Sequence, residues 1–393
     1  MTRSARRFIL VLTGTAFVEW LGASAILPLL PAYLRHQGTS TGGVGLVMSA
    51  YFFAGLLVQY PLGRLGDRIG QRPVLIGGLL SYAVGSLGFL LHPDAIGYIV
   101  LRGAQGAGAG AVQVASFALV GAVVPIDRRG RAFSWLFAGQ LGGMAIGPLA
   151  GSLAGISGMA WLFVATAATS TVASLWVVTS LPKVAAMRDA THTRLVVSRL
   201  LLGVVVTGVV GGLITGVYET CWTLLLDLRG AHAWEVGLSW TLFAAPFAAF
   251  SPVAGWMTDH LNRIVLTIAA LTSSVFFAAL YPFLHTLPLL IGLGSIESIG
   301  VAVAYPAAQS LLAQSVPAAA LGRAQGLSNA TQTAAMAVSA AAAGALFGIA
   351  PWVPFVGAAA SAAVLIGCLP LIWRHGVPQQ ETVVADRKVS VVV

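Results

Sequence analysis

The stretch GRLGDRIGQRPVL, residues 63–75, separates two long apolar runs at about 43–62 and 73–92. Each run has roughly 20 residues, which is the length that an α-helix needs to cross the hydrocarbon core of a bilayer. Glycines in the stretch between them permit a tight turn, and three arginines give it positive charge. We therefore expect a short, positively charged loop between two membrane-spanning helices.

Similar apolar runs recur along the whole chain. The 393 residues are 58% hydrophobic and only 8% charged, whereas soluble domains carry about 25% charged residues. This composition predicts an all-α integral membrane protein and excludes a soluble one. The twelve predicted membrane spans lie at 8–34, 43–62, 73–92, 96–124, 132–155, 159–181, 200–227, 234–258, 264–285, 288–313, 323–349 and 352–374.

The basic residues are distributed unequally between alternate loops. If the N-terminus lies in the cytoplasm, then of the 21 Lys and Arg residues only Arg35 and Arg229 lie outside, and Arg102 lies within a span. Positive charge in the cytoplasmic loops is the usual orientation signal of membrane proteins. We expect a multi-pass protein of the inner (plasma) membrane with both termini in the cytoplasm. The basic charge sets topology, and we expect no nucleic-acid partner.

The chain contains an internal repeat with an offset of 192 residues. The triplet VGL at 44–46 recurs at 236–238, and GRA at 130–132 recurs at 322–324. A single offset over several spans predicts two six-helix halves in parallel, an arrangement in which transporters hold their substrate between the halves. The predicted units are an N-terminal half at 1–181, a cytoplasmic connector at 182–199, a C-terminal half at 200–375 and a cytoplasmic tail at 376–393.

Three stretches carry a resemblance to a known family. Residues 63–75 resemble the cytoplasmic loop motif of the major facilitator superfamily, with Gln71 in place of the usual basic residue. LRGAQGAGAGAVQ, residues 101–113, resembles the span-4 motif of proton-coupled members. GQLGGMAIGPLAG, residues 139–151, resembles a motif of the antiporter branches, although Ser152 replaces the final glycine. By this resemblance the chain is identified as a member of the superfamily, most similar to its twelve-span drug/proton antiporter branch.

The resemblance implies conformational roles for the first and third of these motifs. In the family, the loop motif acts as a latch between orientations of the two halves. The glycines at every fourth position of residues 139–151 give one smooth helix face, and the proline adds a kink. The residues expected to take these conformational roles are Gly63, Asp67, Arg68, Gly70, Arg72, Gly143, Gly147, Pro148 and Gly151.

Ionisable residues within the predicted spans indicate a functional site. A charged group at the centre of a membrane helix costs at least ~2.5 kcal/mol. Glu19 lies near the middle of the first span, and no Lys or Arg occurs between Arg7 and Arg35. Glu19 must therefore be neutral for part of a cycle or meet a cation from another helix, for which Arg102 is available. The residues predicted to couple protons to transport are Glu19, Arg102, Glu219 and Glu297.

Polar and aromatic side chains at helical spacing predict a substrate cavity. Aromatic rings with a few carboxylates suit a moderately apolar or cationic ligand. Helix packing and location at the membrane interface are the alternatives for any single aromatic residue. The predicted cavity residues are Trp20, Gln105, Gln113, Tyr218, Trp222, Tyr305, Asn329 and Gln332.

Together these features predict a secondary active exporter, an antiporter that exchanges protons for small amphipathic or apolar molecules by alternating access. No GxxxxGK[ST] loop occurs, so ATP is not the expected energy source. We expect the proton gradient to supply the energy, with no cofactor, no metal and no catalytic residue. The expected partners are a small-molecule substrate, protons and the lipid bilayer, and the chain is expected to be a monomer.

Other functions remain as alternatives. A lipid or lysolipid translocator and an exporter of one dedicated metabolite have the same fold. A membrane-embedded enzyme is disfavoured because no HExxH or GxSxG motif occurs. A signalling receptor without flux is disfavoured by the short loops between the predicted spans.

Overall fold

The computed structural model of the chain describes residues 3–124, 126–181, 197–316 and 321–374. Within these ranges the chain is α-helical, with three short 3-10 turns and no strand. In the described part of the chain, ten helical segments are long and apolar enough to cross a membrane by their length and composition. Helices α5 and α6 are not among these ten, so a total of twelve spans stays a prediction.

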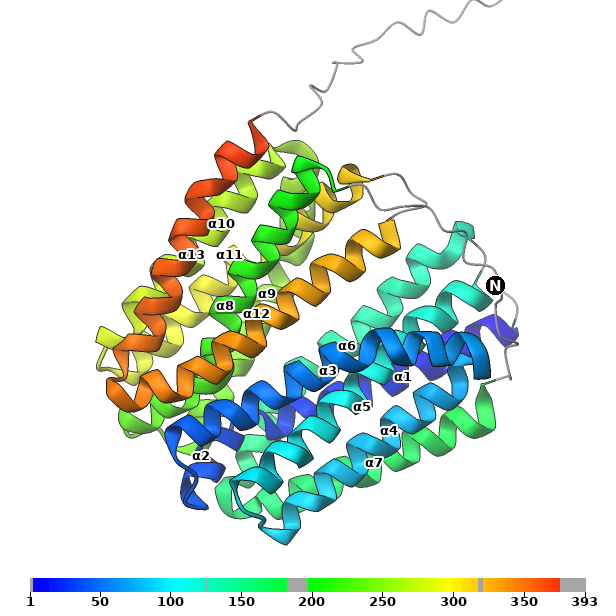
Figure 1. The fold of residues 1–393 in the computed structure, drawn as a ribbon, viewed down its shortest axis with the longest axis horizontal. Helices are drawn as coiled ribbons and strands as arrows, with labels where there is room; N and C mark the ends of the chain where they lie inside the picture. The colour runs from blue at the N-terminus through cyan, green and yellow to red at the C-terminus, as the bar shows by residue number, and fades with distance from the viewer. Residues whose placement is uncertain (1–2, 125, 182–196, 317–320, 375–393) are drawn as a thin grey trace, which may run out of the picture.

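The long helices form two halves of six, with one additional short helix in the first half (Figure 1). The N-terminal half contains α1 (Arg3–Ile26), α2 (Leu30–His36), α3 (Thr41–Ile69), α4 (Gln71–Gly88), α5 (Ala95–Val123), α6 (Ile126–Ala154) and α7 (Met159–Ser180). The C-terminal half contains α8 (Arg199–Leu228), α9 (Ala233–His260), α10 (Arg263–Leu280), α11 (Leu287–Ser315), α12 (Leu321–Ile349) and α13 (Trp352–Trp373). Most of the predicted connector and the predicted tail lie outside the described residues, so those two boundaries stay predictions.

Helix boundaries repeat at the offset found in the sequence. Helix α4 corresponds residue for residue to α10, and α5 corresponds to α11, each with a shift of 192. The 3-10 turns that follow α4 and α10, Phe89–Leu91 and Tyr281–Phe283, are related by the same shift. The prediction of an all-helical fold in two six-helix halves is therefore confirmed.

The first predicted span does not continue to residue 34. Helix α1 ends at Ile26, and α2 begins at Leu30 after a short turn. Pro28 has no backbone N–H to continue the hydrogen-bond ladder, and its ring clashes with the preceding turn of a helix. The prediction of one continuous helix over 8–34 is wrong for this reason.

The prediction that residues 63–75 form a loop is also wrong. Helix α3 continues to Ile69, and α4 begins at Gln71. The two helices are joined at Gly70 alone, where φ is 93°. This left-handed backbone is accessible to glycine at little cost, so one glycine makes the turn that the sequence predicted for a longer segment.

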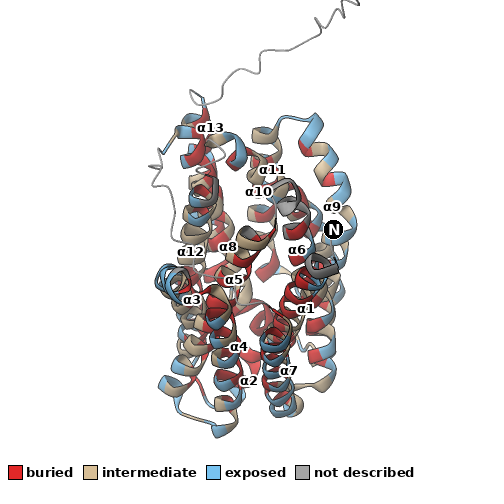
Figure 2. Ribbon diagram, turned by 90° about the vertical axis from the view of Figure 1, so that its right-hand side faces the viewer, coloured by how far each residue is buried: buried red, intermediate tan, exposed pale blue. Residues whose placement is uncertain are grey.

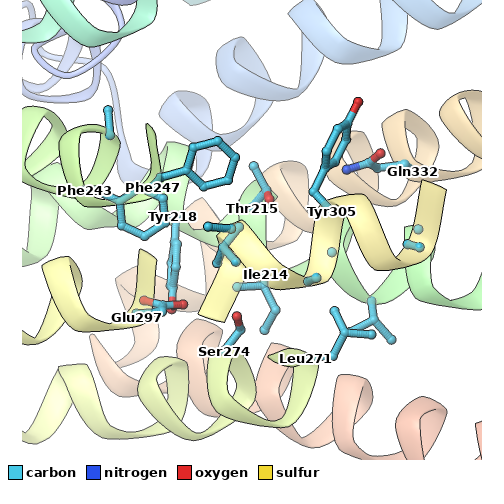
Figure 3. A pocket seen from close by; sticks show the side chains of 18 of the residues that line it. Ile214, Thr215, Tyr218, Phe243, Phe247, Leu271, Ser274, Glu297, Tyr305 and Gln332 are labelled. Carbon is cyan, nitrogen blue, oxygen red and sulfur yellow. The ribbon is translucent and has the colours of Figure 1, made fainter. Parts of the chain in front are cut away.

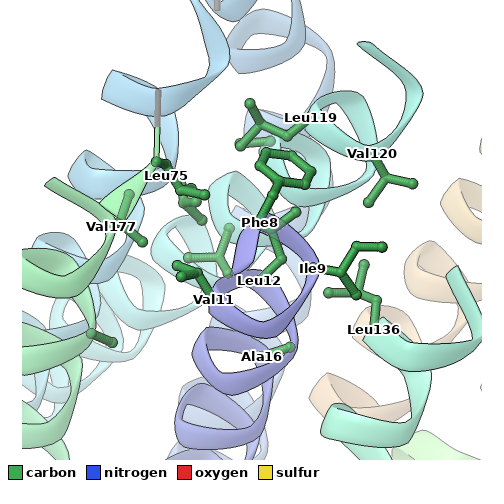
Figure 4. Close-up of a cluster of buried hydrophobic side chains, with 14 of the residues drawn as sticks. Phe8, Ile9, Val11, Leu12, Ala16, Leu75, Leu119, Val120, Leu136 and Val177 are labelled. Carbon is green, nitrogen blue, oxygen red and sulfur yellow. The ribbon is translucent and has the colours of Figure 1, made fainter. Parts of the chain in front are cut away.

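Helix α1 is central to the packing of the N-terminal half. It packs against α6 and α7, and its side chains enter a buried cluster with residues of the surrounding helices. In Figure 4, Phe8 points toward Leu119 of α5, and Val11 points toward Leu75 of α4 and Val177 of α7. Burying side chains of this size stabilises the half by about 1.5–3 kcal/mol for each residue. In Figure 2, buried residues follow the faces where helices meet, and exposed residues face outward.

The two halves contact each other along two seams, α3 against α12 and α6 against α9. In the first seam, a Cβ added at Gly45 would lie 2.7 Å from the carbonyl oxygen of Ala340 and 3.0 Å from Cα of Gly344. In the second seam, a Cβ at Gly237 would collide with the Ser152 side chain and lie 2.5 Å from the carbonyl oxygen of Pro148. Small residues therefore permit both close approaches.

The seams are related by the internal repeat, because Gly45 corresponds to Gly237 and Ser152 corresponds to Gly344. The hydroxyl of Thr223, near the end of α8, also donates a hydrogen bond of 2.5 Å to the carbonyl of Pro28. Figure 1 shows that the halves converge at the end that carries α2 and diverge toward the N-terminus. The described conformation is closed at the α2 end.

Candidate functional site

A cavity of about 690 Å³ lies between the halves, mostly within the C-terminal half. Its walls come from α1 and α6 on one side and from α8 to α12 on the other. Most of the lining side chains are apolar or aromatic. Among the described residues that line the cavity, Glu219 and Glu297 carry the only charges, and none is basic. Figure 3 shows Glu297, Tyr218 and Phe243 at one end and Tyr305 with Gln332 at the other.

Glu297 is held by two tyrosines. The Tyr218 hydroxyl donates to Oε1 at 3.0 Å, and the Tyr281 hydroxyl donates to Oε2 at 2.7 Å. Only 1% of the Glu297 surface is exposed. Hydrogen bonds to an ionised acceptor are worth about 1.5–3 kcal/mol. These bonds fix the carboxylate against α8 and the turn that follows α10.

Aromatic rings surround this carboxylate. The Trp222 ring centre lies 5.0 Å from that of Tyr281 and 6.0 Å from that of Tyr218. The Trp222 indole N–H donates to the Ser239 hydroxyl at 2.9 Å. The hydroxyls of Tyr218 and Tyr281 and the indole N–H of Trp222 each donate a hydrogen bond. These bonds hold the three aromatic rings in place beside the cavity.

Glu219 is the second carboxylate of the cavity. Its Oε2 atom is buried and accepts no hydrogen bond from the part of the chain that the structure describes. Arg102, in the opposite half, lies within electrostatic range of it. Glu219 thus faces both the cavity and the buried arginine.

Arg102 lies in a separate cluster within the N-terminal half. Its guanidinium carbon lies 4.3 Å from the ring centre of Tyr51, and Nη1 donates to Oε1 of Gln105 at 2.8 Å. Gln105 in turn donates to the Ser86 hydroxyl at 2.9 Å. The arginine is 2% exposed, so cation–π and hydrogen-bond contacts replace its lost hydration.

Glu19 lies beside this cluster without joining it directly. Its side chain is 6% exposed, and its charge acts on Tyr51 and Tyr82 together with that of Arg102. Within the described ranges, no ion pair or hydrogen bond connects Glu19 to Arg102 in this conformation. A pairing of Glu19 with Arg102 in another conformation stays a prediction.

The structure separates the predicted site residues into two groups. Glu219 and Glu297 line the cavity, and so do Trp20, Tyr218, Trp222, Tyr305 and Gln332. Glu19, Arg102, Gln105, Gln113 and Asn329 are not among the described lining residues. Asn329 instead accepts a hydrogen bond of 2.9 Å from Gln325, its neighbour one helical turn away.

Sequence reasoning missed two residues that now stand out. Tyr281 bonds to Glu297, and Tyr51 stacks beneath Arg102. Each could have been found from the repeat. Tyr281 corresponds to Phe89 and Tyr51 corresponds to Phe243, so both positions carry an aromatic ring in both halves.

The glycines of the third motif lie against α1. A Cβ at Gly143 would lie 2.6 Å from the carbonyl oxygen of Phe17, and one at Gly151 would collide with Ala25. The Ser24 hydroxyl donates to the carbonyl of Gly143 at 3.1 Å. Helix α6 continues through Pro148. These contacts place α1, which carries Glu19, directly against the helix that forms the second seam.

Residues of the first motif lie at the end of the N-terminal half. Gly63 and the exposed Arg68 belong to α3, and Arg72 donates a hydrogen bond to the carbonyl of Val178 in α7. The side chain of Asp67 lies outside the described part of the structure, so its predicted latch role stays a prediction.

Comparison with known proteins gives the family. The family model described as Major Facilitator Superfamily matches residues 12–226 and again residues 200–390. This chain belongs to the Major Facilitator Superfamily. Its described fold is that of a superfamily transporter. The crystal structure of a D-xylose–proton symporter superposes on 96% of this chain and 99% of its own, with a TM-score of 0.74 at 14% sequence identity. The superfamily consists of membrane transporters, so this member is a transporter and not an enzyme.

Curated superfamily relatives resemble the chain in part of their length. The inner membrane transport protein YajR of Escherichia coli is 32% identical over 42% of this chain and 37% of its own length. A chloramphenicol resistance protein of Pseudomonas aeruginosa is 35% identical over 37% of this chain and 35% of its own. The class E tetracycline resistance protein of Escherichia coli is 27% identical over 65% of this chain and 67% of its own length. The chain matches about a third of the length of the first two relatives. These similarities support the predicted drug-efflux branch.

Proposed function

We propose that this superfamily member is a proton-coupled antiporter that exports small apolar or amphipathic molecules by alternating access. The observation that carries this proposal is the mostly apolar 690 Å³ cavity between the halves, with two carboxylates in its wall. A drug-sized ligand fits a pocket of roughly 300–1,000 Å³ with few polar groups. Relatives named for chloramphenicol and tetracycline resistance supply the first compounds to test.

Proton coupling is assigned to the buried carboxylates. Glu19 lies 12 residues after Arg7, the first residue of the apolar span Arg7–Ile26, hence ~18 Å along α1 at 1.5 Å per residue and near the middle of a ~30 Å hydrocarbon core. It has no bonded counter-charge within the described chain, and a bare carboxylate in such surroundings is costly. Glu19 can therefore carry a proton in one orientation and release it in another. The proton gradient replaces ATP, and no cofactor takes part.

Orientation completes the proposal. With both termini in the cytoplasm, as the arginine distribution favours, the end closed by the seams faces outward. The cavity then communicates with the cytoplasm in the described conformation, which suits loading of an export substrate. The membrane is the bacterial inner membrane, and the transporter acts as a monomer.

The test is export by purified protein in liposomes under an imposed pH gradient. Wild type should accumulate chloramphenicol or tetracycline against its gradient when protons flow in the opposite direction. Glu19→Gln, which is neutral and has the same size, should fold normally and lose gradient-driven export. Glu19→Asp should retain part of it. Normal gradient-driven export by well-folded Glu19→Gln would remove Glu19 from the mechanism.

A further inference from the structure

The cavity lies where the C-terminal repeat lacks side chains that fill the N-terminal repeat. At the offset of 192 residues, Arg102 corresponds to Gly294 and Tyr82 corresponds to Ser274. Arg102 and Tyr82 are buried within their half, whereas Gly294 and Ser274 line the cavity. Two large side chains are thus replaced by two small ones, and both small residues border the cavity.

The N-terminal half shows how a guanidinium group fits into this repeat position. The Arg102 guanidinium lies over the Tyr51 ring, with 4.3 Å from Cζ to the ring centre. It donates a 2.8 Å hydrogen bond to the side-chain oxygen of Gln105, one turn along the same helix. The planar cation therefore rests between an aromatic face and an oxygen acceptor.

Both supporting positions are kept in the C-terminal half, and one gains a charge. Tyr51 corresponds to Phe243, which keeps the ring, and Gln105 corresponds to Glu297, which turns the amide into a carboxylate. Phe243 and Glu297 lie together at one end of the cavity (Figure 3). A carboxylate binds a guanidinium more strongly than an amide does, because the hydrogen bonds are charge-assisted and can be bidentate.

Glu297 can accept from such a group when the Tyr218 hydroxyl leaves Oε1, because its carboxylate is only 1% exposed while both tyrosines are bonded to it. A Cβ placed at Gly294 would meet only the Tyr281 hydroxyl, at 4.0 Å. An ionised carboxylate offers about four acceptor positions, and Tyr218 and Tyr281 occupy two of those on Glu297. Glu219, whose Oε2 atom accepts no described hydrogen bond, is a second carboxylate in the lining of the cavity.

We propose that this end of the cavity binds a planar organic cation, a guanidinium or amidinium group, in the place that the Arg102 side chain occupies in the other half. The cation lies against Phe243 and donates to Glu297, taking the position of the Tyr218 hydroxyl at Oε1. An apolar tail extends past Ile214 and Leu271 toward the far end of the cavity. The inference rests on the proposed function, since it names the class of compound that the transporter carries.

The test compares three ligands with the same tail on the full-length protein in nanodiscs of zwitterionic lipid. Octylguanidinium is planar and cationic, octylurea is planar and neutral, and octyltrimethylammonium is cationic without N–H donors. Calorimetric binding, corrected with empty nanodiscs, should give octylguanidinium an affinity at least tenfold above both others. Equal affinity for octylguanidinium and octylurea, or for octylguanidinium and octyltrimethylammonium, would overturn the proposal.

Variants locate the site. Glu297→Gln should reduce the preference for octylguanidinium over octylurea to less than about twofold, and an unchanged preference would contradict the assignment. Gly294→Arg supplies a tethered guanidinium and should abolish binding of added octylguanidinium, while Gly292→Ala, in the same helix and outside the described lining, should preserve it. Should Gly294→Arg fail to fold in size-exclusion chromatography, the ligand series and Glu297→Gln still decide.

The same preparation separates this inference from the proposed function. Chloramphenicol, a neutral molecule, is assayed for export driven by a pH gradient in parallel with the binding series. Export of chloramphenicol without a preference for octylguanidinium would refute the cation site and leave the antiporter intact. A clear preference for octylguanidinium without any gradient-driven export would support the cation site and refute the antiporter.

Discussion

Substituting Gly237 by alanine should open the closed end of the transporter. Gly237 lies in α9 at the second seam, where an added methyl group would collide with Ser152 and lie 2.5 Å from the carbonyl oxygen of Pro148. Ordinary contacts of a Cβ begin near 3.4 Å, so the helices must separate by about 1 Å. Because the proline carbonyl belongs to backbone inside α6, a side-chain rotation cannot relieve the contact.

The expected magnitude follows from the cost of overpacking, which is about 1–3 kcal/mol for extra methylene-sized groups in a packed interface. This cost applies to the conformation in which the seam is closed and is absent when the halves separate. A difference of 1–3 kcal/mol changes the ratio of two conformations by about 5- to 150-fold. Opening of the α2 end should therefore become more frequent by that factor.

A cysteine in the other seam reports the opening. Met48 is fully buried near Gly45 in the first seam, so Met48→Cys should react with a maleimide only when the halves part. The exposed Cys368 is replaced by alanine, and labelling of the buried Cys221 is measured in each variant without Met48→Cys and subtracted. Labelling is measured on purified protein, where both sides are accessible and orientation plays no part.

The control is Gly255→Ala in the same helix, where an added Cβ meets nothing within 4 Å. Gly237→Ala should label Met48→Cys about 5- to 150-fold faster than the control variant does. Equal labelling rates in the two variants would show that the seams do not open as one unit. This result would contradict a mechanism in which the two halves move as rigid bodies.

Three further outcomes are expected. Gly147→Ala places a Cβ 2.8 Å from the carbonyl oxygen of Leu21 and should destabilise the α1–α6 contact by about 1–3 kcal/mol. Its melting temperature should be lower than that of Gly357→Ala, where the added Cβ has open space. Equal melting temperatures of the two variants would refute this close contact. Tyr281→Phe removes one donor to Glu297 and should cost about 1–3 kcal/mol in the same assay, whereas an unchanged melting temperature would mean that this bond adds nothing. A reporter fused after Arg374 should read as cytoplasmic, and a periplasmic signal would reverse the topology.

The sequence predicted the architecture because its signals are additive over long segments. Twenty-residue apolar runs and one repeat offset each depend on many residues, so a wrong interpretation of one residue does not change the predicted spans or halves. The failures occurred where one residue decides: Pro28 ends α1 early, and Gly70 alone makes a turn that was expected to take a longer loop.

The candidate site was less predictable, because helical spacing gives the face of a residue and not what packs against that face. The sequence predicted a place in the cavity for Gln105 and a proton-coupling role for Arg102, one turn away on the same helix. In the structure Arg102 donates a hydrogen bond to the side-chain oxygen of Gln105, and both residues are buried away from the cavity. The contact of Tyr281 with Glu297 joins the turn after α10 to α11, and no local sequence pattern specifies how these two elements pack.

Antiport itself is tested most directly by letting a substrate gradient alone drive protons. Liposomes that contain the protein and a pH-sensitive dye start with equal pH on both sides, and the membrane voltage is clamped with potassium and valinomycin. Chloramphenicol, or the compound that best stabilises the protein in a thermal-shift screen, is then added outside. Exchange of substrate for protons predicts that the lumen becomes more alkaline with wild type and stays constant with Glu19→Gln. A lumen that turns acidic would indicate symport, and a constant lumen pH with measurable substrate entry would indicate uniport, either of which contradicts proton-coupled export.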